Sequence, residues 1–186
     1  MTDTRIRDML LASVAAALAV TVLVGCSASK KKAPAEGKYS NTSFLFNVVV
    51  PSSWARQENI SKEAPVRFVS PKDGNDDKFR ENIEVRVEKL PGSFDTKSHA
   101  EGWVVNMQRT YSDFVLLQKD TVQVNGTEMV KVLFTLKKPP ADDAQVLAYL
   151  FAKGSRGFVI LCTALPSTYS AYGKQFEDIC NTFEAY

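Results

Sequence analysis

One cysteine of this 186-residue chain stands where its thiol could be modified covalently. It closes the motif Leu23-Val24-Gly25-Cys26, at the end of an apolar run that follows Arg5 and Arg7. The run is shorter than the ~20 residues that span a bilayer comfortably. A short positive segment, an apolar segment and a small residue before the cleavage point are typical of a secretory signal peptide. The pattern therefore predicts a signal peptide over residues 1–25, and it disfavours the alternative of an uncleaved anchor.

The motif resembles the lipobox of bacterial lipoproteins. The resemblance implies that the Cys26 thiol carries diacylglycerol and that a fatty acid such as palmitate is attached to its freed amine. A single acyl chain binds a bilayer only marginally, whereas two or more hold a protein there stably. We therefore expect a lipid-anchored protein in the cell membrane or the outer membrane, with its domain facing outside the cytoplasm. The same resemblance favours the outer membrane, because Ser27 stands where aspartate would signal inner-membrane retention.

The stretch after Cys26 contains Ser, Lys, Ala, Pro and Gly, with almost no apolar side chains up to Asn41. This composition predicts a flexible tether over residues 26–41. Its Lys30-Lys31-Lys32 run could attract anionic headgroups at about 1 kcal/mol per lysine, but polybasic lipid sites usually hold more charges. A solvated linker is therefore the favoured interpretation of the run, and the folded domain is expected over residues 42–186.

Two further thiols, Cys162 and Cys180, remain after removal of the leader. A cysteine pair on core-facing positions of an exported protein predicts a disulfide. Distance along the chain opposes it: Cys180 lies about 18 Å from the start of its predicted helix, and Cys162 only about 10 Å from the end of its strand. A bridge needs the Cα atoms within about 7 Å, hence a steep crossing or a longer turn. The alternative is two buried thiols, and no Cys-x-x-Cys motif favours redox catalysis.

Residues for acid–base or metal chemistry are sparse. His99 is the only histidine and lies beside the apolar stripe of a predicted helix, where a boundary role is favoured over a base or ligand. The aspartates of loop 72–78 lack the carboxylate that closes an EF-hand at its twelfth position. The chain has no Gly-x-Ser-x-Gly, His-Glu-x-x-His or phosphate-binding glycine loop, although a pair of acting carboxylates would leave no such motif. We expect no metal, no cofactor and no enzymatic activity.

The charge balance of the folded part excludes one class of partner. The whole chain has a formal net charge of +2, but from Lys38 onward 18 Lys and Arg face 18 Asp and Glu. The surplus therefore belongs to the leader and the tether. A neutral domain lacks the one-sided basic face that nucleic-acid binding needs, so nucleic acid is not an expected partner.

Hydrophobic periodicity predicts the elements that must position these residues. The Asn125-Gly126 pair supplies the two positive φ angles of a type I′ hairpin turn. Runs 146–151 and 158–162 are apolar at every position, so we expect them at the centre of a sheet with helices above and below. Helical spacing predicts helices over 98–111 and 168–181. The other expected strands are 44–50, 66–69, 83–88, 121–124 and 127–136.

The strand expected over residues 83–88 has two different faces. Ile83, Val85 and Val87 are apolar, and they alternate strictly with three charged residues, which are Glu84, Arg86 and Glu88. Side chains alternate between the two faces of a sheet, so this strand must have one polar face. The pattern predicts a strand near a sheet edge or with one side uncovered.

The order of elements resembles the PsbP-like lipoproteins. The likeness is carried by FLFNVVVPSSW at 44–54, by LCTA at 161–164 and by FEDICNTF at 176–183. The resemblance implies an α+β domain with a central antiparallel sheet of about six or seven strands and helices on both faces. The family includes a photosystem II extrinsic subunit and bacterial envelope lipoproteins, and most members are non-enzymatic.

Two functions fit these expectations. The first is a membrane-anchored envelope lipoprotein whose domain is a non-enzymatic binding or assembly module for a protein partner. The alternative is a carrier of a small apolar ligand, held in a pocket between sheet and helix that Trp103, Tyr149 or Tyr172 lines. Large aromatic residues are more often ordinary core, and this is the favoured interpretation for these three and for Trp54.

Overall fold

The computed structural model describes residues 37–138 and 141–186 of the chain. Within these residues it has ten strands and two helices. In chain order they are β1 (Lys38–Asn41), β2 (Phe46–Val49), β3 (Ala55–Glu58), β4 (Val66–Val69), β5 (Asn82–Lys89), α1 (Thr96–Thr110), β6 (Val115–Val124), β7 (Thr127–Lys138), β8 (Ala141–Lys153), β9 (Arg156–Ala164), α2 (Tyr169–Cys180) and β10 (Glu184–Ala185).

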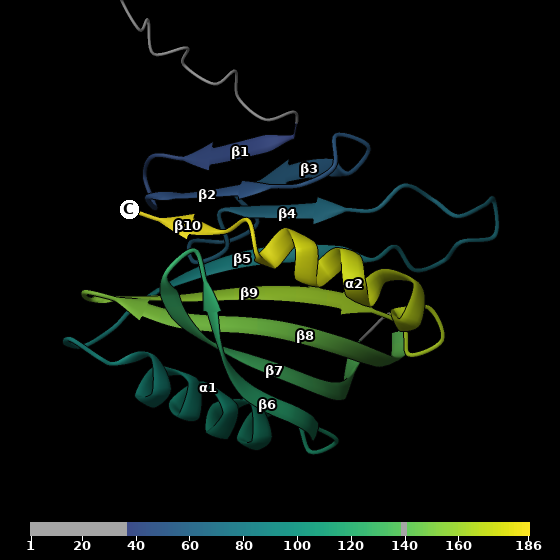
Figure 1. Cartoon of the computed structure of the whole chain (residues 1–186). Helices are drawn as coiled ribbons and strands as arrows, with labels where there is room; N and C mark the ends of the chain where they lie inside the picture. The colour runs from purple at the N-terminus through teal and green to yellow at the C-terminus, as the bar shows by residue number, and fades with distance from the viewer. Residues whose placement is uncertain (1–36, 139–140) are drawn as a thin grey trace, which may run out of the picture. The chain divides into compact units, whose positions relative to one another are not determined.

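A seven-stranded antiparallel sheet forms the centre of the fold, in the order β3-β4-β5-β9-β8-β7-β6. A second sheet has the order β1-β2-β10 (Figure 1). The prediction of an α+β fold with six or seven antiparallel strands is confirmed. The two wholly apolar runs lie in β8 and β9, which pair with each other near the middle of the large sheet. Asn125 and Gly126 have φ values of 48° and 77°, as the hairpin turn requires.

Alternate residues of β8 belong to two separate hydrophobic clusters. Tyr149 and Phe151 pack in the cluster that contains Phe176 of α2. Ala148 and Leu150 pack in the cluster that contains Trp103 of α1. Successive side chains of a strand point to opposite faces, so the two helices bury different sets of side chains from the same strand. Neither helix in the described residues combines the length and apolar character needed to cross a membrane.

The folded domain begins earlier than composition predicts. Residues 38–41, expected in the tether, form β1 and pair with β2 in register Lys38↔Val49. Tyr39 holds the strand in place: it is 6% exposed, and its ring lies edge-on to Phe68 at 5.6 Å between centroids. The composition of the segment is that of a linker, and a single well-packed aromatic residue outweighs it.

Other elements also differ from the expected ones: β8 runs over Ala141–Lys153 rather than 146–151, and β10 was not expected. β6 begins at Val115 rather than at residue 121, because pairing with β7 continues past the alternating part of its sequence. β2 begins at Phe46 rather than at residue 44, because Leu45 has a φ of 58° and belongs to a turn. β3 is a fully exposed edge strand with the sequence Ala-Arg-Gln-Glu, which carries no hydrophobic period to predict it.

Candidate binding groove

A groove of about 390 Å³ lies beside α1, between the helix and the strands of the large sheet. We call it the α1 groove, and it has one apolar wall and one polar wall. The apolar wall consists of Trp103, Met107, Phe134, Leu136, Val146 and Leu161. The polar wall consists of Arg67, Glu84, Arg86 and Glu88. Its volume is within the range of about 300–1,000 Å³ that is usual for small-ligand sites.

Helical spacing places the apolar wall. Trp103 and Met107 are four residues apart on α1 and so lie on one helix face. Trp103 packs edge-on against Phe134 of β7, with 5.7 Å between the ring centroids. Asp95 caps the start of the helix: its carboxylate accepts hydrogen bonds from the backbone N–H and the hydroxyl of Ser98, both at 2.8 Å. The wall is therefore built on well-anchored elements.

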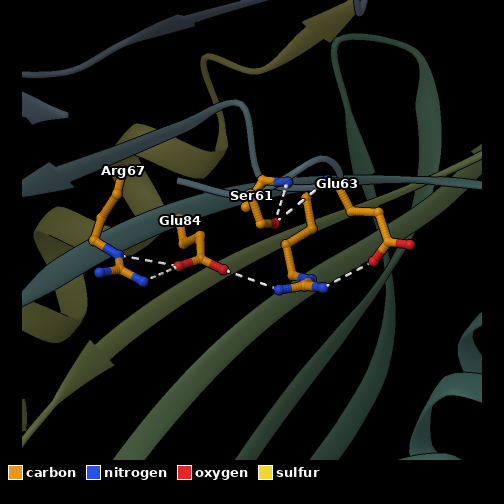
Figure 2. Close-up of polar contacts among 6 residues, drawn as sticks. Ser61, Glu63, Arg67 and Glu84 are labelled. Carbon is orange, nitrogen blue, oxygen red and sulfur yellow. Dashed lines mark hydrogen bonds and ion pairs between the residues drawn. The ribbon is translucent and has the colours of Figure 1, made fainter. Parts of the chain in front are cut away.

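Charged residues of β4 and β5, with one loop carboxylate, form the ion-pair row of the polar wall. Arg67 lies opposite Glu84 in the β4–β5 register and donates to Glu84 Oε2 from Nε at 3.0 Å and from Nη2. Arg86 donates to Glu84 Oε1 at 3.2 Å and to Glu63 Oε2 at 3.1 Å. Figure 2 shows Arg67, Glu84 and Glu63 along this row. Glu84 is only 8% exposed, and the two guanidinium groups compensate its charge.

Glu88 lies two residues beyond Arg86 and has a different environment. Among the described residues, its carboxylate takes part in no hydrogen bond and in no ion pair. Partial burial raises the pKa of Glu88, and the nearby positive charge of Arg86 only partly opposes this shift. Glu88 is thus a half-buried carboxylate that no described side chain neutralises by direct contact.

His99 lies in the first half of α1, packed onto β9. It is 5% exposed, and its ring lies so close to Gly157 that a Cβ there would be 2.5 Å from Cε1. Its Nε2 atom has no hydrogen-bond partner among the described residues. Burial lowers the pKa of His99, although a backbone hydrogen bond with Phe158 acts in the opposite direction. The ring is a buried neutral group rather than the boundary residue expected from sequence.

We expect His99 to make the domain less stable in mild acid. Because the pKa of His99 is lower in the folded state than in the unfolded chain, the unfolded chain binds the extra proton first as pH falls below about 6.5. The free energy of unfolding should therefore drop from about pH 7 to pH 5. A His99→Gln variant should lack this component, so the difference between the two pH profiles in urea denaturation measures it. Parallel profiles would contradict the prediction.

The other aromatic residues proposed for a pocket lie elsewhere. Tyr149 is buried in the cluster around α2. The Tyr172 hydroxyl donates to the Asp73 carboxylate at 3.0 Å, and its ring lies beside Trp54. Only Trp103 lines the α1 groove, so Tyr149 and Tyr172 are corrected as pocket residues. Trp54 is 6% exposed and belongs to the core, as expected.

Cys162 and Cys180 come together in the core. Their sulfur atoms lie 3.6 Å apart, both residues are fully buried, and both are free thiols rather than the expected disulfide. Burial raises the pKa of Cys162, so its thiol stays protonated. α2 passes close enough to the end of β9 to bring the two sulfurs into contact. They meet even though Cys180 is farther from the start of its helix than Cys162 is from the end of its strand.

Two expectations from the sequence remain, which concern a metal site and the lipidation motif. The described residues contain no group of three or more His, Cys, Asp or Glu that could hold a metal ion, and Asp73 instead accepts the bond from Tyr172. Leu23, Val24, Gly25 and Cys26 lie outside the described residues, so lipidation stays a prediction. Sequence reasoning did not identify Arg67 as a site residue, because no pattern around it distinguishes it. The alternation in residues 83–88, in contrast, had indicated the polar face of β5.

Comparison with known proteins shows the fold. No protein-family model matches the chain, and no curated protein matches its sequence. Among solved structures, cyanobacterial PsbP (CyanoP) from Synechocystis has a TM-score of 0.56 at 15% identity, covering 80% of this chain and 91% of that one. PA94 of Pseudomonas aeruginosa has a TM-score of 0.57 at 12% identity, and the match covers 78% of this chain and 93% of that one. PA94 is a protein of unknown function that is described as a putative regulator. The Ran-binding protein Mog1p of Saccharomyces cerevisiae has a TM-score of 0.55 at 15% identity. The match covers 80% of this chain and 94% of that one.

These likenesses confirm the PsbP-like fold that the sequence resemblance implied. At such low identity they carry the architecture and no residue-level function. The α1 groove must therefore be interpreted from its own geometry.

Proposed function

We propose that this chain is an envelope lipoprotein, held at a membrane by lipid on Cys26, whose domain is a non-catalytic module that binds a protein partner through the α1 groove. The observation that carries the proposal is the groove itself, in which an apolar wall adjoins a polar wall of engaged ion pairs. Protein interfaces commonly combine aromatic and Arg anchors in this way.

The ion pairs of the polar wall favour binding over catalysis. Each guanidinium group is engaged by Glu84, which is held in turn between Arg67 and Arg86. Groups held in this way present a fixed charge pattern to a partner rather than a free acid or base. A protein of the same fold, Mog1p, is named for binding another protein, Ran. This supports a binding role for the fold without assigning a partner to this chain.

The groove volume also favours a second candidate, a carrier of a small apolar ligand. Trp103 and Met107 offer an apolar surface in a cavity of small-ligand size. Native mass spectrometry of the purified chain separates the two functions. A retained small molecule that is lost in a Met107→Asp variant would favour the carrier, and its absence would oppose it.

The anchor predicts where the protein is found. A Cys26→Ala variant has no thiol to receive diacylglycerol, so it should lose incorporation of labelled fatty acid. It should also lose stable membrane association, because stable anchoring needs at least two acyl chains. Labelling and fractionation of cells that express the parent, Cys26→Ala and Cys180→Ala chains measure both effects. Equal labelling of the parent and Cys26→Ala chains would contradict the lipid assignment.

The groove predicts where a partner binds. A photo-crosslinking residue at Thr110, which lines the α1 groove, should form a discrete adduct with one protein in intact cells. The same residue at the exposed Lys174 of α2 is the matched control and should not form that adduct. Met107→Asp should abolish the Thr110 adduct while the chain stays folded by circular dichroism. Identical adducts from both positions, or none from either, would oppose binding through the groove.

A further inference from the structure

The polar wall contains one carboxylate that no guanidinium group contacts directly. Two carboxylates, Glu84 and Glu88, and two guanidinium groups, Arg67 and Arg86, line the α1 groove. Glu84 pairs with both guanidinium groups, and Arg86 also pairs with Glu63, which does not line the groove. Among the described residues, Glu88 has no ion-pair partner.

The position of Glu88 makes its carboxylate accessible to a ligand. Glu88 and Trp103 line the same cavity, from β5 and from α1 respectively. Partial burial strips water from the carboxylate, which is why its pKa is raised. A cation beside it would recover the lost solvation energy, and a positive group is also attracted to the face of an indole ring.

The guanidinium groups of the same wall attract an anion less strongly than Glu88 attracts a cation. The Nε and Nη2 atoms of Arg67 donate to Glu84. Arg86 donates from both Nη atoms, to Glu84 and to Glu63. An incoming anion would have to compete with carboxylates already in place, whereas an incoming cation meets a carboxylate with no described partner. The unpaired carboxylate of Glu88 therefore makes the groove favour a cation over an anion.

We propose that the α1 groove binds a cation carried on an aliphatic stem, with an ammonium or guanidinium group at Glu88 and the stem against Trp103 and Met107. This inference rests on the proposed function because it concerns the same groove. The occupant that fits this function is a Lys or Arg side chain of the partner protein, and a free alkyl amine is the competing occupant that the test must separate from it. Both present a positive head and an apolar stem of the same kind.

Three small probes of six carbons each test the charge preference. Hexylamine, hexanol and hexanoate are titrated into the full chain while the two indole N–H resonances are followed by NMR. Hexylamine should shift the Trp103 signal saturably and leave the signal of Trp54, which lies in the α2-side core, unchanged. Hexanol and hexanoate should bind at least about tenfold more weakly, because neither can form a charge-assisted hydrogen bond with Glu88. Equal binding by the three probes would overturn the inference.

Removal of the Glu88 charge tests the residue. Glu88→Gln keeps the shape of the side chain and should weaken hexylamine binding by about tenfold or more. Glu184→Gln makes the same charge change on exposed β10 and should leave the affinity unchanged. An unchanged affinity in Glu88→Gln, with the Trp103 resonance in its native position, would show that Glu88 does not hold the cation.

A last comparison separates the two occupants and isolates the inference from the proposed function. A short peptide with one Lys between Leu residues is compared with its norleucine counterpart and with spermidine. Tighter binding of the Lys peptide than of spermidine assigns the cation to a protein side chain, and the reverse order assigns it to a free amine. Failed amine binding with an intact Thr110 adduct overturns the inference alone. Intact amine binding with no Thr110 adduct overturns the proposed partner alone.

Discussion

A Gly157→Ala variant is expected to lose about 2 kcal/mol of unfolding free energy. A Cβ on this residue of β9 would lie 2.5 Å from Cε1 and 2.8 Å from Nε2 of His99, too close for unbonded atoms. Because His99 is only 5% exposed, its ring cannot swing into solvent unless the start of α1 moves with it. Interiors packed at crystal density do not absorb such an insertion freely. Urea denaturation of the variant and the parent measures the difference.

A second glycine gives the matched control. Gly102 lies inside α1, where a Cβ would meet nothing within 4 Å. Gly102→Ala should therefore stabilise the domain by about 0.5–1 kcal/mol, since alanine is the better helix former. In the double variant His99→Ala/Gly157→Ala the clash is absent, so its cost should be smaller than the sum of the two single costs. A Gly157→Ala chain as stable as the parent would contradict the close packing of α1 on β9.

Much of the fold is visible in short-range sequence patterns. The Asn125-Gly126 turn and the apolar runs within β8 and β9 were predicted because turn chemistry and burial on both faces leave local traces. β1 left no such trace. Its only buried side chain is Tyr39, which packs against Phe46 of β2 and against the more distant Phe68. A polar segment ordered by one aromatic side chain cannot be distinguished from a tether by composition.

The groove was predictable in its parts and not in its assembly. Alternation placed Glu84, Arg86 and Glu88 on one face of a strand, and helical spacing placed Trp103 on the buried face of α1. That these two faces border one cavity depends on the strand order β5-β9-β8-β7, which joins segments far apart in the chain. Tyr149, offered beside Trp103 as a pocket residue in the carrier alternative, packs in the other cluster for the same reason. Its neighbours Ala148 and Leu150 face α1, and a shift of one residue reverses the face.

The thiol pair shows how tertiary geometry can decide between alternatives that sequence leaves open. Distances along the strand and the helix placed Cys162 and Cys180 unequally far from the turn that joins β9 to α2, and this opposed a disulfide. In the folded domain the sulfurs lie 3.6 Å apart, so the fold closes the gap that those distances left. Contact alone does not oxidise the pair, however. Burial raises the pKa of Cys162, and the thiolate that attacks an oxidant is scarce.

Oxidation of this pair should therefore depend on whether the chain is folded when the oxidant arrives. In a Cys26→Ser background, the folded reduced chain should resist iodoacetamide and mild oxidants, since neither thiol is exposed to solvent. The same chain refolded from urea in an oxidising buffer should lose both free thiols and the mass of two hydrogens. The bridged form should then gain about 3 kcal/mol of unfolding free energy over the reduced form, as expected for a loop of this length.

Single-cysteine variants make this prediction specific to the pair. Cys162→Ala and Cys180→Ala each retain one buried thiol, so neither should respond to reductant in its unfolding free energy. Both should be less stable than the reduced parent by the loss of a buried sulfur, which is a packing effect independent of redox state. If the parent chain keeps two free thiols after refolding with oxidant, the prediction is wrong. The sulfur contact at 3.6 Å then belongs to a core that stays reduced. An equal reductant response in the parent and in either variant would show that the bridge does not join these two residues.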